Sequence, residues 1–112
     1  LSSMFGNSDV GWGLSWEFGG APWDNRATYL KWSPITYVEK CTTPLLIIHS
    51  EFDLRCNIEQ GDQMFVALKY LKREVEYVRF PDEPHGLSRH GRPDRREARL
   101  KFIVDWFDRY LK

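Results

Sequence analysis

The segment from Leu45 to His49 restricts the fold of this 112-residue chain most strongly, because it begins with four successive apolar residues rather than alternating ones. Such a pattern is typical of a strand that is covered on both faces, as in a parallel sheet. A helix-like segment over about 58–72 and a second strand-like segment over 74–80 follow it. This order predicts an α/β fold built on a βαβ unit, with parallel strands over about 45–49 and 74–80.

Three helices are expected around these strands. The first covers about 23–32 and has Asp24 as a possible N-terminal cap. The second, over 58–72, has one apolar stripe, and Gly61 slightly weakens its first turn. The third covers about 94–110 and has a wide apolar face. The remaining stretches are expected to be loops and connectors, the first with short helical pieces: 1–22, 37–43 and 81–93.

An acidic and a basic side chain follow the two predicted strands at the points where the strands end. Asp53 comes after the first strand and His85 after the second. Open α/β sheets hold their sites at the carboxyl ends of parallel strands, so we expect the two side chains to meet. In a catalytic triad the acid orients the imidazole, and the imidazole takes the proton of the nucleophile. Asp53 and His85 therefore fit the last two members of a Ser…Asp…His hydrolase triad, in chain order.

These residues also have purely structural interpretations. An aspartate after a strand is often a turn or cap residue, and a histidine beside proline and glycine is often an ordinary loop residue. The matched positions of Asp53 and His85 give the catalytic interpretation about equal weight with that of two unrelated loop residues. Arg55 could be a surface arginine or form a salt bridge within its loop, or it could orient the active-site loops or a substrate carbonyl group; we favour the first, structural role.

No residue of the chain fits the nucleophile. Ser15 and Ser88 each have a glycine two positions before them but none two positions after. Neither follows a predicted strand and opens a helix, which a nucleophile elbow requires. Cys56 lies on the same loop as the predicted acid, which is an improbable place for a nucleophile. We therefore expect the isolated chain to be inactive.

The composition excludes several classes of function. Sixteen basic and sixteen acidic residues cancel, so no basic field would attract nucleic acid or an anionic membrane. No apolar stretch approaches a membrane span, and the first residues lack the regions of a signal peptide. We expect a cytoplasmic protein in which Cys41 and Cys56 are reduced.

A metal centre and an organic cofactor are not expected either. Asp82, His85 and His90 could be drawn as a cluster, but zinc sites usually have helical histidine spacing or paired cysteines. No glycine-rich phosphate loop follows a strand. The expected chemistry therefore depends on side chains alone.

Long stretches of the chain are similar to those of one known family. They include Ile47-Ile48-His49-Ser50-Glu51-Phe52-Asp53-Leu54-Arg55-Cys56, His85-Gly86-Leu87-Ser88-Arg89, Trp16-Glu17-Phe18-Gly19-Gly20-Ala21-Pro22-Trp23 and Trp106-Phe107-Asp108-Arg109-Tyr110-Leu111. In these stretches the chain resembles the prolyl oligopeptidase family of serine peptidases, and its acylaminoacyl-peptidase branch in particular.

This resemblance implies that residues 1–112 are the C-terminal part of an α/β-hydrolase domain that normally follows a β-propeller. It implies Asp53 as triad acid and His85 as triad base, with the serine upstream of Leu1. The parent enzyme would hydrolyse short peptides. An esterase or lipase is the alternative, because the same fold hosts both activities.

A non-catalytic role is a further alternative. The predicted first strand is apolar on both faces, and two strands alone do not make a stable sheet. Its outer edge would carry unpaired backbone groups. We therefore expect the chain to pair with the missing part of the hydrolase domain or to associate with itself.

Overall fold

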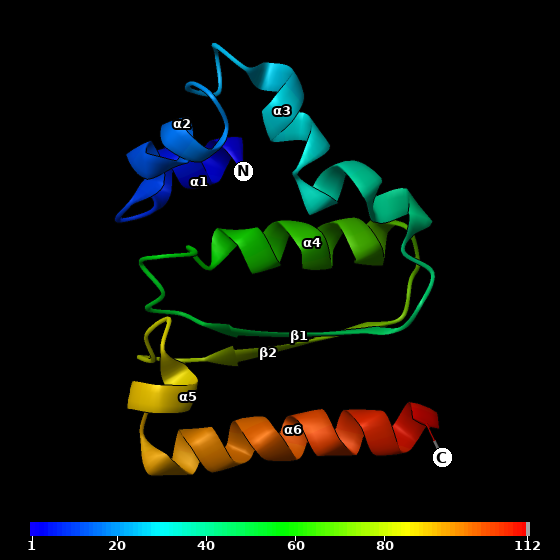
Figure 1. The fold of residues 1–112 in the computed structure, drawn as a ribbon. Helices are drawn as coiled ribbons and strands as arrows, with labels where there is room; N and C mark the ends of the chain where they lie inside the picture. The colour runs from blue at the N-terminus through cyan, green and yellow to red at the C-terminus, as the bar shows by residue number, and fades with distance from the viewer. Residues whose placement is uncertain (112) are drawn as a thin grey trace.

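A computed structural model describes residues 1–111 of the chain, and Figure 1 shows its elements. Two parallel strands form one sheet, and all other elements are helical. In chain order the elements are α1 (Ser2–Asn7), the 3-10 helix η1 (Gly11–Gly13), α2 (Leu14–Glu17), α3 (Arg26–Lys31), the 3-10 helix η2 (Pro34–Lys40), β1 (Leu45–Ser50), α4 (Glu59–Tyr70), β2 (Val75–Phe80), α5 (Leu87–His90) and α6 (Pro93–Leu111).

The two strands form the middle layer of the molecule. α4 lies on one side of the sheet and α6 on the other, and the N-terminal helices lie beyond α4 (Figure 1). β1 and β2 pair in parallel, with Leu45 opposite Val75 and Ser50 opposite Phe80. The predicted βαβ unit and its parallel strands are therefore confirmed, and the observed strand bounds differ from the predicted ones by one residue.

The core lies mainly between the sheet and the two long helices. Leu68 of α4 is 1% exposed, Phe80 of β2 is 2% exposed and Trp106 of α6 is 7% exposed. Phe80 also meets the ring of Phe102 edge to face at 6.3 Å. Full burial of an apolar side chain contributes about 1.5–3 kcal/mol. Residues Leu45 to His49 of β1 are only half-buried, because the outer edge of β1 has no neighbouring strand among the described residues.

The first of the three predicted helices, α3, begins later than the sequence predicts, and its predicted cap is wrong. α3 begins at Arg26, and its N-cap is Asn25. A carboxylate oxygen of Asp24 instead accepts a hydrogen bond from the backbone N–H of Ala21 at 3.1 Å. The aspartate therefore closes the turn before the helix rather than its first turn.

Two of the expected connectors are also partly helical. Residues 34–40 form η2, whose proline at the start supplies a helical φ angle without needing a backbone partner. The short helix α5 interrupts the expected loop 81–93. Both pieces are short, and short helices leave little periodicity in a sequence.

Gly61 in the first turn of α4 is required by close packing. A Cβ atom at this position would lie 2.6 Å from the Tyr77 hydroxyl and 2.9 Å from Nδ1 of His49. The glycine weakens the helix in isolation, but it lets α4 approach both side chains of the sheet.

We predict that Gly61→Ala destabilises the intact protein by about 1–3 kcal/mol, since overpacking outweighs the helix propensity that alanine gains. Urea unfolding measures this difference. Gly6→Ala in α1 is the matched control, because a Cβ there meets no atom within 4 Å. A Gly61→Ala variant as stable as Gly6→Ala would contradict the packing argument.

Candidate active site

The candidate site lies where the loops after β1 and β2 run side by side. The backbone N–H of Glu51 donates to Phe80 O at 2.9 Å, and that of Phe52 donates to Glu83 O at 3.1 Å. These two bonds continue the parallel pairing past the strand ends. They place the loop that carries Asp53 next to the loop that carries His85.

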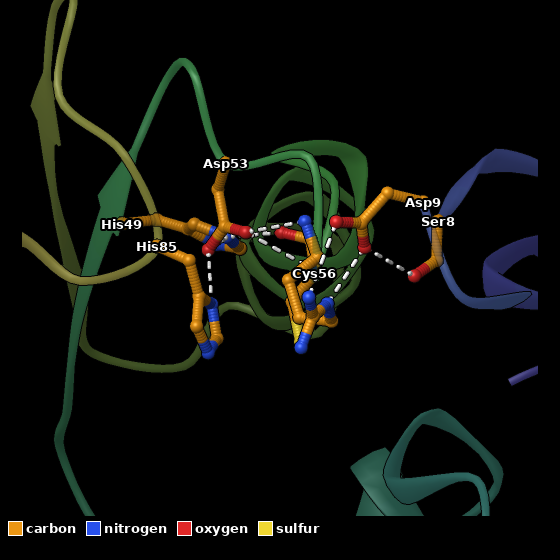
Figure 2. Close-up of polar contacts among 7 residues, drawn as sticks. Ser8, Asp9, His49, Asp53, Cys56 and His85 are labelled. Atoms are coloured by element: carbon orange, nitrogen blue, oxygen red, sulfur yellow. Dashed lines mark hydrogen bonds and ion pairs between the residues drawn. The ribbon is translucent and has the colours of Figure 1, made fainter.

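Asp53 and His85 form a direct hydrogen bond (Figure 2). Nδ1 of His85 lies 2.8 Å from Oδ2 of Asp53. Asp53 is 5% exposed, whereas half of the His85 side chain is exposed. Because an ionised carboxylate only accepts hydrogen bonds, Nδ1 carries the proton. In the neutral imidazole, Nε2 is then left as the proton acceptor.

The backbone of the acid loop holds the Asp53 carboxylate in place. Oδ1 accepts hydrogen bonds from the backbone N–H groups of Arg55 at 3.0 Å and Cys56 at 2.8 Å. This is a tight turn closed by an aspartate side chain, a common role of the residue. One oxygen therefore binds the loop while the other binds His85, so the structural and catalytic interpretations of Asp53 are compatible.

A second histidine, His49, contacts the same carboxylate. Its Nε2 lies 3.4 Å from Oδ2 of Asp53 and 2.7 Å from the carbonyl oxygen of Cys56 (Figure 2). The sequence analysis missed this residue. The sequence feature that could have indicated it is a polar side chain directly after the apolar residues Leu45 to Ile48, four positions before Asp53.

Glu83 was also missed. It is a buried acid on the base loop, with 2% of its surface exposed. One carboxylate oxygen accepts a hydrogen bond from the backbone N–H of Arg92 at 3.3 Å. This contact ties the loop that carries His85 to the start of α6. No feature of the sequence separates Glu83 from the exposed acids of an ordinary loop.

Arg55 points to the N-terminal part of the chain. Its Nε and Nη2 atoms lie 2.6 and 3.2 Å from the two carboxylate oxygens of Asp9. The backbone N–H of Asp9 also donates to Leu54 O at 2.8 Å. The Arg55 guanidinium lowers the pKa of Asp9, and Asp9 raises the pKa of Arg55. This arrangement matches a residue that orients the acid loop.

A polar cavity of about 270 Å³ opens beside the acid and the base. Cys56 and Ser88 are among the residues that line it. Burial and then the nearby Asp53 carboxylate raise the pKa of the Cys56 thiol, which disfavours the reactive thiolate. Ser88 lies in the short helix α5 and Ser15 in α2, so neither occupies a strand-to-helix elbow.

Residues 1–111 contain no group of three or more histidine, cysteine and acidic side chains that could hold a metal ion. Across the same residues, no helix has the length and apolar character needed to cross a membrane.

Comparison with known proteins identifies the family. The model of the prolyl oligopeptidase family matches residues 1–112. Among curated relatives, the uncharacterized peptidase YuxL of Bacillus subtilis is 42% identical over 110 residues, which is 97% of this chain and 17% of that protein. Dipeptidyl-peptidase 5 of Schizosaccharomyces pombe is 34% identical over 96 residues, or 86% of this chain and 14% of that protein.

Solved structures show the same relationship. Uncomplexed acylaminoacyl peptidase of Pyrococcus horikoshii matches with a TM-score of 0.91 at 36% identity, over 99% of this chain and 18% of that one. An acylaminoacyl peptidase in complex with Z-Gly-Gly-Phe-chloromethyl ketone matches with a TM-score of 0.87 at 34% identity, over 95% of this chain and 17% of that one.

The fold is that of part of an α/β-hydrolase domain, as in acylaminoacyl peptidase. The chain belongs to the prolyl oligopeptidase family. Both the predicted family and the predicted fold class are confirmed. The chain spans less than a fifth of the length of these relatives.

We predict that Asp9→Asn loosens the acid loop, because the charged pair with Arg55 is lost. Hydrogen exchange of residues 52–57 should be faster than in the unsubstituted protein at neutral pH. The pKa of Asp9 is lowered in the folded state, so its contribution is present at neutral pH and is lost as the pH falls through that lowered value. The difference in exchange should therefore shrink at pH values below about 4.

The matched control is Asp105→Asn, which removes a carboxylate that pairs with Lys101 on α6. It should leave exchange in the acid loop unchanged. Equal exchange rates in the Asp9→Asn and unsubstituted proteins at neutral pH would contradict a loop-orienting role of the Arg55–Asp9 pair.

Proposed function

We propose that residues 1–112 supply the acid and the base of a serine peptidase, with Asp53 as triad acid and His85 as triad base. The observation that carries this proposal is the 2.8 Å hydrogen bond between Nδ1 of His85 and the buried Asp53 carboxylate. It leaves Nε2 on a half-exposed side chain as the proton acceptor.

The proposed steps follow from this geometry. Nε2 of His85 takes the proton of a serine hydroxyl as the serine oxygen attacks the peptide carbonyl, and it then returns the proton to the leaving amine. An acyl-enzyme forms, and water hydrolyses it by the same proton route. Asp53 keeps Nδ1 protonated and stabilises the imidazolium that forms. These steps require no metal ion and no organic cofactor.

The nucleophile, in this proposal, belongs to residues outside the 112. Ser15 and Ser88 both lack the elbow context, and Cys56 has a raised pKa. Residues 1–112 would then be the C-terminal part of the hydrolase domain, with the nucleophile elbow and a propeller elsewhere in the protein. The small share of each relative that the chain covers supports this division.

The proposed substrate of the parent enzyme is a short peptide, acylated or free at its N-terminus. The names of the relatives, acylaminoacyl peptidase and dipeptidyl-peptidase 5, support this class. Arg55 is proposed to orient the acid loop, since its guanidinium pairs with Asp9; binding of a substrate carbonyl is its alternative role. The free thiols of Cys41 and Cys56 support a cytoplasmic location.

We also propose that the outer edge of β1 pairs with a further strand, from the rest of the hydrolase domain or from another copy. β1 has one strand neighbour among the described residues. An apolar-lined cavity of about 410 Å³ lies between β1 and α6, beside Leu46, Ile103 and Phe107. An unpaired edge next to exposed apolar surface favours association.

In the intact enzyme we predict that Asp53→Asn lowers kcat by about 10⁴-fold, because the amide no longer holds the imidazole in the reactive tautomer. His85→Gln should have at least as large an effect. Hydrolysis of an N-acylated amino-acid 4-nitroanilide measures kcat, and a fluorophosphonate probe measures the rate at which the serine is labelled. Asp105→Asn is the control, since it makes the same substitution at an exposed carboxylate that pairs with Lys101 on α6. Full activity of Asp53→Asn would overturn the assignment.

For the purified 112-residue chain we predict no turnover of the same 4-nitroanilide. Turnover that an organophosphate inhibits would show that the nucleophile lies within these residues.

Light scattering on the same purified chain tests whether the outer edge of β1 mediates association. Discrete oligomers support self-association, whereas a cooperatively melting monomer at micromolar concentration contradicts it.

A further inference from the structure

His49 contacts the acid loop through a single ring nitrogen. Nε2 lies 2.7 Å from the carbonyl oxygen of Cys56. Because a carbonyl oxygen only accepts hydrogen bonds, Nε2 carries a proton and donates it. The same nitrogen lies 3.4 Å from Oδ2 of Asp53, which is the oxygen that accepts the hydrogen bond from His85. The N–H group is therefore directed at the Cys56 carbonyl, and Oδ2 of Asp53 lies close to the same nitrogen.

These contacts close a ring around the acid loop. The Asp53 carboxylate accepts a hydrogen bond from the backbone N–H of Cys56 at 2.8 Å, and the carbonyl of Cys56 accepts one from His49. The ring is completed by the 3.4 Å approach of His49 Nε2 to the carboxylate. His49 belongs to β1, which is paired with β2 along its length. The ring therefore connects the loop to the most regular part of the fold.

Packing fixes the orientation of the His49 ring. Its side chain is 14% exposed. Gly61 of α4 lies against it so closely that a Cβ would approach Nδ1 to 2.9 Å. Tyr77 of β2 lies against the same glycine. A side chain with so little free space keeps one rotamer, which is the condition for holding a neighbouring group precisely.

We propose that His49 is a positioning residue for the triad acid. By donating to Cys56 O, it holds the acid loop and so keeps the Asp53 carboxylate aligned with Nδ1 of His85. This inference rests on the proposed function, because it concerns the same acid and base. His49 acts through Asp53 and does not touch the reacting atoms.

Loss of the donor would leave the Cys56 carbonyl without this partner and let the loop relax. A misplacement of about 1 Å at a catalytic group can lower the rate by about 100-fold. His49 lines the cavity beside the acid and the base, but only 14% of its side chain is exposed, so we expect substrate binding to change little. The expected signature is therefore a lower kcat with an unchanged KM.

The test compares His49→Met with His49→Gln in the intact enzyme. The two side chains have similar size, but only glutamine carries an N–H donor at its end. We expect His49→Met to lower kcat and the rate of fluorophosphonate labelling by about 10- to 100-fold. His49→Gln should recover both rates to within about threefold. Lys101→Met is the control for a methionine placed away from the site, since Lys101 is exposed and pairs with Asp105 on α6.

A His49→Met enzyme with unchanged rates would overturn the inference. So would a folded His49→Gln enzyme that is as slow as His49→Met at an equal melting temperature, because a merely structural role predicts no recovery by a donor. If His49→Met does not fold, Gly61→Ala replaces it, since its Cβ would crowd the His49 ring at Nδ1 as well as the Tyr77 hydroxyl. An unchanged kcat in folded Gly61→Ala would equally overturn the inference.

Asp53→Asn separates this inference from the proposed function. If Asp53→Asn keeps the unsubstituted labelling rate, the proposed triad is wrong whatever His49 does. If Asp53→Asn is inactive while His49→Met is fully active, the triad stands and the positioning role of His49 fails.

Discussion

The parallel pairing of β1 and β2 is the constraint on which the site depends. Six residue pairs, from Leu45 and Val75 to Ser50 and Phe80, fix the register. Two further backbone bonds extend the pairing into the loops that follow. A shift of one residue would turn each side chain to the opposite face of the sheet. It would also separate Asp53 from His85, so the register of the sheet determines the distance between acid and base.

The second requirement is that the carboxylate of Asp53 stays almost fully buried. Asp53 is 5% exposed, and burial of an unpaired charge is costly. Here two backbone N–H groups and two imidazole rings surround the carboxylate. Such a group has few alternative positions, which is the property that a triad acid requires.

Much of the fold follows from patterns that are local in sequence. The apolar run from Leu45 and the stripe of the helix around Leu68 each predict their element, and their order predicts parallel strands. The cap of α3 was mispredicted because Asp24 and Asn25 are adjacent and both residue types favour caps. Only the geometry of the preceding turn decides between them.

The residues of the candidate site likewise include some that local sequence patterns predict and some that they do not. Asp53 and His85 were predictable because both follow strands. The contacts of His49 and Glu83 were not, because each depends on how two loops fold back onto distant backbone groups. The partner of Arg55 lies 46 residues away, and no local pattern indicates it.

The attachment of the acid loop to the N-terminal segment has a consequence for folding. Contacts between residues far apart in sequence carry a loop-closure cost, so they form later than local ones. Asp9 reaches Leu54 and Arg55 across such a separation. The βαβ unit can therefore form before the catalytic acid has its final surroundings. Loss of the contacts of Asp9 would leave the pairing of β1 with β2 in place while the acid loop loses its outer support, which makes this attachment the part of the site that opens most easily.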